Sequence, residues 1–185
     1  MALVHSYDPP ERFVTGTVGE PGARTFFLQA RAGARLTSVA LEKQQVAALA
    51  ERMDELLDEV MGSDTRAVVP AVAPVGTVDL NPLEQPIEEE FRVGTMTLSW
   101  DPDDERVVVE VFPVDETGFS AEAGEAAEPE ELLVVRLPPA AARSFVQRAE
   151  QVISAGRPDC PFCGLPIDPA GHLCVRANGF RRRAT

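Results

Sequence analysis

The stretch TFFLQARAGARLTSVALEKQQVAALAERMDELLDEVMG, residues 25–62, changes its hydrophobic period half-way along. Its first part, up to Leu41, is rich in aromatic and β-branched residues and is broken at Gly33, which predicts two strands joined by a turn. From Glu42 to Met61 the apolar residues recur at the spacing of one helix face, and Gly62 supplies a stop. With a further strand expected at residues 13–18, the first third of the chain is predicted to be a β-β-β-α unit.

A second set of such elements follows after residue 90. Its expected strands are residues 91–100, 106–112 and 132–137, and its expected helix opens at Pro138-Pro139 and ends at Gly156. The segment between the two sets, residues 62–90, holds four prolines and is expected to be mostly irregular, with an additional edge strand at residues 66–72 as an alternative.

The two sets also resemble each other in sequence. Phe13 recurs as Phe91 at an offset of 78, and residues 36–41 align with residues 132–137 at an offset of 96. We interpret this as a duplication, although chance agreement of generic patterns is the alternative. The predicted fold is α+β, with two β-β-β-α repeats (about residues 11–62 and 91–157) that form an antiparallel sheet with two packed helices, within a body of residues 1–157.

The C-terminal part, residues 158–185, holds the run CPFCGLPIDPAGHLC and ends in a basic tail. Cys160 and Cys163 are two residues apart, which suits a tight knuckle, and His172 and Cys174 leave one face of an extended segment. Thiolate and imidazole are the ligands that zinc prefers, and four protein ligands leave no position open for water. The pattern therefore predicts a structural Cys3His zinc site in a small C-terminal zinc-knuckle module, with Zn²⁺ as its cofactor.

Two other interpretations of these cysteines compete with the zinc site. Disulfide bonding is disfavoured because three cysteines are an odd number and the N-terminal residues show no secretory signal pattern. The run CPFC is similar to the active site of glutaredoxins, in which the first cysteine sits at a helix start. Here Gly164, Pro166 and Pro169 follow, so no helix is expected to begin at Cys160.

Charge and composition limit the classes of partner that the chain can bind. The 185 residues carry a net charge of −13; the part from Cys160 onward has four arginines and one aspartate, so residues 1–159 carry −16. So acidic a body is expected to repel nucleic acid and anionic membranes, which leaves the basic tail as the one segment suited to bind them. Without a membrane-spanning apolar run or a signal pattern, we expect a cytoplasmic protein.

Several single residues receive ordinary structural interpretations. His5 is expected to be exposed in an N-terminal loop, and Trp100 to pack at a rim. Gln29 and Arg31 alternate with apolar neighbours and are expected on the solvent face of a strand, and residues 42–45 in a solvated first helical turn. The strongly acidic residues 115–131 are expected to form a solvated loop.

The chain resembles a known family in three places. These are the segments FFLQAR at residues 26–31 and LEKQQ at residues 41–45, and the C-terminal run CPFCGLPIDPAGHLC with NGFRR after it. They are similar to an uncharacterised family of actinobacteria, a repeat protein classed as domain of unknown function 3090. The resemblance implies a cytosolic bacterial protein and brings no activity, substrate or catalytic residue with it.

Three functions remain open from the sequence. The first is a non-enzymatic interaction or adaptor protein that binds another protein and has a structural zinc site. The second is nucleic-acid binding, with Arg176 and Arg181-Arg182-Arg183 on phosphates. The third is a thiol oxidoreductase that uses Cys160. The sequence holds no Gly-rich phosphate loop, GxSxG or HExxH motif, so no catalytic residue is predicted.

Overall fold

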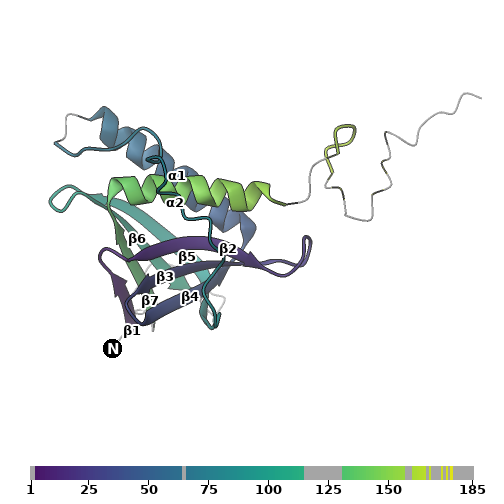
Figure 1. Cartoon of the computed structure of the whole chain (residues 1–185), viewed down its shortest axis with the longest axis horizontal. Coiled ribbons are helices and arrows are strands. Elements are labelled where there is room, and N and C mark those ends of the chain that lie inside the picture. The colour runs from purple at the N-terminus through teal and green to yellow at the C-terminus, as the bar shows by residue number, and fades with distance from the viewer. Residues whose placement is uncertain are drawn as a thin grey trace, which may run out of the picture.

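The computed structural model describes residues 3–63, 66–114, 131–156, 160–165, 167, 172, 174 and 176. Seven strands and two helices make up the described body (Figure 1). In chain order they are β1 (Leu3–Tyr7), β2 (Arg12–Val18), β3 (Thr25–Ala32), β4 (Arg35–Leu41), α1 (Lys43–Gly62), β5 (Glu89–Asp101), β6 (Arg106–Pro113), β7 (Glu131–Leu137) and α2 (Pro139–Ser154). The α+β class predicted from the sequence is confirmed.

All seven strands belong to one sheet, in the order β1-β7-β6-β5-β4-β3-β2. Neighbouring strands run antiparallel within β2-β3-β4 and within β5-β6-β7. The two halves join through a parallel contact between β4 and β5, and β1 adds parallel to β7. The sheet is therefore mixed, and the prediction of a wholly antiparallel sheet is wrong. A head-to-tail arrangement of two three-stranded units, with the third strand of one beside the first strand of the next, produces the parallel contact.

The two halves share their order of elements and part of their register. The offset of 96 that aligns the sequences also carries the bounds of β4 onto those of β7 and the first residue of α1 onto that of α2. In the matching strand pairs, Phe26 lies opposite Leu41 and Val107 opposite Leu137. The duplication itself stays a prediction.

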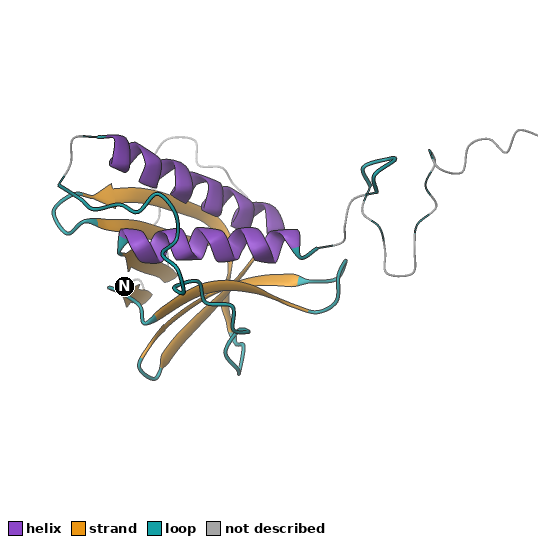
Figure 2. Ribbon diagram, turned by 45° about the horizontal axis from the view of Figure 1, so that its top comes forward, coloured by secondary structure: helices purple, strands orange, loops and turns teal. Residues whose placement is uncertain are grey.

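Both helices lie on the same face of the sheet, side by side (Figure 2). Each helix packs on strands of the other half, because α1 contacts β5 and α2 contacts β2. Phe13 of β2 stacks on Phe145 of α2 with ring centroids 4.7 Å apart. The core between sheet and helices thus joins the two halves, and neither half would bury its apolar face alone.

Helix α1 begins with a reciprocal cap. The Glu42 side chain accepts from the backbone at Gln45, and the Gln45 side chain accepts from the backbone N–H of Glu42 at 2.8 Å. The Gln45 amide also donates to the carbonyl of Val93 on β5 at 3.1 Å. Glu42 and Lys43 are exposed as expected for a solvated first turn, but Gln45 additionally fastens the helix to the sheet.

The other face of β2-β3-β4 is covered by the segment after α1. Leu83 packs there on Val14, Phe27 and Ala40 in a second, smaller apolar cluster. Gly16 makes this contact close, because a Cβ at that position would lie 2.6 Å from Leu83. Residues 66–72 form no strand, so the alternative of an edge strand there is wrong.

The N-terminal segment is a strand and not the expected loop. β1 pairs with β7, and the sheet curls so that β1 also contacts β3 and β4. The hydroxyl of Tyr7 lies 2.7 Å from that of Thr37 on β4, and Arg35 donates to the carbonyl of Ser6. His5 is consequently half-buried, which corrects the prediction that it is exposed.

Candidate metal centre

A tight turn at residues 160–165 brings the first two cysteines together. The backbone N–H of Gly164 donates to the carbonyl of Cys160, and the N–H of Cys160 donates to the carbonyl of Leu165, both at 2.8 Å. Gly164 has a φ of +73°, a conformation that costs little only for glycine. Figure 1 shows the turn beyond the end of α2, away from the sheet.

The four predicted ligands converge at this turn. The Sγ atoms of Cys160 and Cys174 lie 3.7 Å apart, and Sγ of Cys163 lies 3.3 Å from Nε2 of His172. All four donor atoms lie within 4.8 Å of one another. Bonds of about 2.3 Å to sulfur and about 2.0 Å to nitrogen give tetrahedral edges of about 3.8 Å between two sulfurs and about 3.5 Å between sulfur and nitrogen. We call these side chains the Cys3His cluster, and they lie close enough to hold a metal ion.

The turn shifts the pKa values of its two cysteines in opposite directions. Burial raises the pKa of Cys160, but hydrogen bonds from the backbone of Phe162 and Cys163 and from the neighbouring thiols outweigh it and lower this pKa to about 7. For Cys163 the hydrogen bond from the backbone of Leu165 lowers the pKa, but burial and the neighbouring thiols of Cys174 and Cys160 outweigh it and raise this pKa. Backbone amides that point at sulfur favour thiolates, the form that binds metal.

The rest of the C-terminal module is described only in part. Arg176 donates to the carbonyl of Phe162 at 3.4 Å, so it contacts the first turn of the cluster. The predicted basic tail, Arg181-Arg182-Arg183, lies outside the described residues. The same holds for the acidic segment 115–130 and for residues 157–159, between the body and the cluster.

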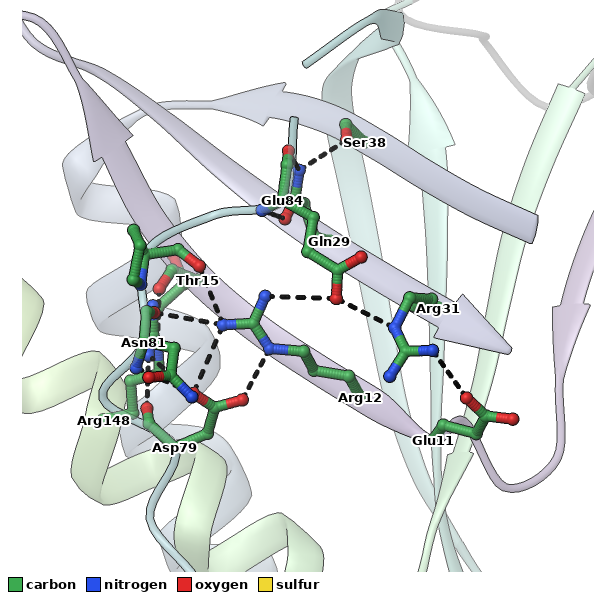
Figure 3. Close-up of polar contacts among 11 residues, drawn as sticks. Glu11, Arg12, Thr15, Gln29, Arg31, Ser38, Asp79, Asn81, Glu84 and Arg148 are labelled. Atoms are coloured by element: carbon green, nitrogen blue, oxygen red, sulfur yellow. Dashed lines mark hydrogen bonds and ion pairs between the residues drawn. The ribbon is translucent and has the colours of Figure 1, made fainter. Parts of the chain in front are cut away.

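A polar network lies on the sheet face opposite the helices (Figure 3). It includes Gln29 and Arg31, which were expected to face solvent. Gln29, expected on a solvent face, is only 2% exposed. Its amide nitrogen donates to Ser38 and to the carbonyl of Glu84, and its amide oxygen accepts from the N–H of Glu84. The prediction was wrong because the segment around Leu83 covers this face. Arg31, half-buried, pairs with Glu11 and Glu84.

Two arginines that the sequence analysis did not single out hold this region together. Arg12 donates two hydrogen bonds to Asp79, from Nε to Oδ2 at 2.5 Å and from Nη2 to Oδ1 at 3.2 Å. This side-chain hydrogen bonding lowers the pKa of Asp79. Arg148 of α2, which is 5% exposed, donates to the carbonyl of Thr15 at 2.7 Å and to the carbonyl of Asp79. Burial lowers the pKa of Arg148, against the charge of Asp79. The polar position of Arg148 on an apolar helix face was the available sequence signal.

A pocket of about 270 Å³ lies between β2 and α2, where the halves meet. Its polar lining is already bonded within the protein: Ser144 to Thr77 at 2.6 Å, and Arg148 to β2 and Asp79. A small molecule would find few free polar partners there.

Comparison with family models gives a match over residues 5–174 to the family described as protein of unknown function (DUF3090). The chain belongs to this family. The DUF3090 match runs through both halves of the sheet and includes all four residues of the Cys3His cluster. Neither the search of curated proteins nor that of solved structures found a match. Within the described residues, neither helix combines the length and apolar character needed to cross a bilayer.

Proposed function

We propose that the protein is a non-enzymatic interaction protein whose C-terminal knuckle is held by one structural zinc ion. The observation that carries the zinc assignment is the convergence of the four donor atoms within 4.8 Å of one another, with two separations, 3.7 Å between two sulfurs and 3.3 Å between sulfur and nitrogen, close to tetrahedral edges. Three thiolates and one imidazole form a soft set that favours zinc over magnesium, calcium or manganese. With four protein ligands no coordination position is left for a substrate, which favours a structural over a catalytic role.

The interaction role rests on what the knuckle presents. Phe162 is 63% exposed and Leu165 is 56% exposed, although both are large apolar residues within the turn that carries Cys160 and Cys163. A metal ion bound behind them would fix their positions and lower the entropy cost of docking. We expect the partner to be a protein with an apolar pocket for Phe162, because aromatic anchors contribute strongly to protein interfaces.

The two alternative functions find less support. Cys160 is buried and begins a turn instead of a helix, so the reactive thiolate of a glutaredoxin-like site has neither the access nor the helix dipole it needs. For nucleic acid, Arg176 is the described member of the proposed basic set, and its guanidinium contacts the carbonyl of Phe162.

Native mass spectrometry of the reduced full-length protein tests the zinc assignment. We expect one zinc per chain, lost on chelation and absent from Cys160→Ser and Cys174→Ser. A chain that carries no metal but is alkylated rapidly at Cys160 would favour the oxidoreductase instead.

Quantitative co-purification from the source cells tests the interaction role. Phe162→Ser should reduce recovery of the bound protein while zinc content stays at one per chain. Val75→Ser is the matched control, because Val75 is also an exposed apolar residue but lies on a loop of the body. Equal recovery with both variants would show that the knuckle is not the docking site.

A further inference from the structure

A second group of metal-ligand side chains lies in the body, far in sequence from the Cys3His cluster. His5 of β1, Glu90 of β5 and Glu131 of β7 place one ligand atom each within 4.8 Å of one another. We propose that these three residues, the His5 cluster, form a second metal site that binds one first-row divalent cation and keeps coordination positions open.

The charges of the cluster call for a cation. The Nε2 atom of His5 lies 2.7 Å from Oε1 of Glu131, and this is the one ion pair among the described residues that involves no arginine. Glu90 and Glu131 thus bring two carboxylates together beside a single imidazole. Arg35, the arginine that contacts β1, stacks on Tyr7 and donates to the carbonyl of Ser6, so it does not neutralise them.

The position of the cluster is fixed by the sheet. His5 continues the core-facing row of Tyr7, and Glu131 continues that of Leu133, so both side chains lie at the end of the core and are half-buried. The pairing of Leu3 with Glu131 sets their mutual register. Ligands on strands are held more firmly than ligands on loops, which favours a preorganised site.

A chain of hydroxyl groups orients the imidazole. Nδ1 of His5 lies 3.4 Å from the hydroxyl of Thr37, which lies 2.7 Å from the hydroxyl of Tyr7, and both of these residues are buried. Without a cation, the Nε2–H of His5 donates to Glu131; when the ring proton is on Nδ1 and is donated to Thr37, Nε2 offers its lone pair to an ion bound beside the carboxylates. An outer hydrogen bond of this kind is the usual support of a metal-bound histidine.

The ligand set defines the class of ion. One imidazole and two carboxylates suit manganese, iron or zinc as divalent ions, whereas a site of oxygen alone would suit magnesium or calcium. Three protein ligands leave positions for water or for an anionic ligand, which the closed Cys3His cluster lacks.

Manganese is the probe that separates the two clusters, since its preference for oxygen and nitrogen keeps it from the thiolates. Zinc-loaded full-length protein is titrated with MnCl2, and free Mn²⁺ is followed by electron paramagnetic resonance. We expect one Mn²⁺ per chain, with a nitrogen coupling in the pulsed spectrum from the His5 ring. His5→Gln should remove that coupling, and both His5→Gln and Glu90→Gln should weaken binding by at least about tenfold.

Glu88→Gln is the matched control, because Glu88 is exposed and lies two residues before Glu90. It removes the same charge and should leave Mn²⁺ binding unchanged. Glu90 is itself exposed, so Glu90→Gln keeps the fold, which circular dichroism verifies. The proposal is overturned if Mn²⁺ does not bind, if Glu90→Gln and Glu88→Gln weaken it equally, or if bound Mn²⁺ shows no nitrogen coupling.

Discussion

The two histidines of the chain lie in clusters of opposite construction. The Cys3His cluster is drawn from residues 160–174, and its turn is closed by two backbone hydrogen bonds. The His5 cluster joins β1, β5 and β7, and its hydrogen-bonded pair is 126 residues apart in sequence. We expect the local cluster to depend on a metal for its order, whereas the sheet positions the long-range cluster before any ion binds.

Substituting the two histidines one at a time gives the largest expected effect, which is on metal binding. His172→Gln removes a zinc ligand, and zinc sites of this kind supply roughly 10 to 16 kcal/mol of apparent binding free energy to local folding. We expect loss of zinc with unchanged Mn²⁺ binding and an unchanged melting transition of the body, measured by native mass spectrometry and circular dichroism. His5→Gln should weaken Mn²⁺ binding and leave the zinc content unchanged.

One result of these substitutions would contradict the contrast between the two clusters. If His172→Gln also lowered the melting temperature of the body, the knuckle would pack on the sheet and would not be an independent metal-dependent unit.

A core substitution tests the dependence of the His5 cluster on the sheet. Leu133 is fully buried in β7, two residues after Glu131. Leu133→Ala leaves a cavity and should lower the free energy of unfolding by about 2 to 5 kcal/mol, and it should weaken Mn²⁺ binding while zinc content stays constant. Leu80→Ala is the control, because Leu80 is 67% exposed. Its free energy of unfolding, measured by urea denaturation, should change by less than about 0.5 kcal/mol.

Arg148 tests how the helices hold the sheet on which that cluster depends. Arg148→Met keeps much of the side-chain volume but leaves the carbonyls of Thr15 and Asp79 without their donor. We expect a loss of about 2 to 3 kcal/mol in urea denaturation. Arg52→Met is the control, because Arg52 is 75% exposed and pairs with Glu55 alone among the described residues. Equal effects of the two substitutions would show that the Arg148 contacts contribute little.

The same contrast between local and long-range contacts explains what could be predicted. Helix α1 and strands β3 and β4 were predictable because periodicity and turn residues are local signals, and the Cys3His cluster was predictable for the same reason. Gln29 was misplaced because its partner Glu84 is 55 residues away and lies in a segment without regular structure. β1 was missed because its partner β7 lies near the other end of the body, and without that strand His5 had no neighbours to indicate a site.

Acid should loosen the body through Asp79, and this is the smallest expected effect. The hydrogen bond from Arg12 lowers the pKa of Asp79 below its ordinary value of 3.8. A carboxylate with a lowered folded pKa stabilises the protein above pH 3.8, and this contribution is lost as the pH falls through the folded value. We expect Asp79→Asn to lower the free energy of unfolding, measured by urea denaturation, by about 1 to 2 kcal/mol at pH 7 and by progressively less below pH 4.

Asp101, whose pKa Arg136 lowers, contributes to the acid dependence of both the wild-type protein and the Asp79→Asn variant, so the difference between them isolates Asp79. A cost of Asp79→Asn that is the same at pH 7 and at pH 3 would show that the Arg12 contact acts through shape and not through charge.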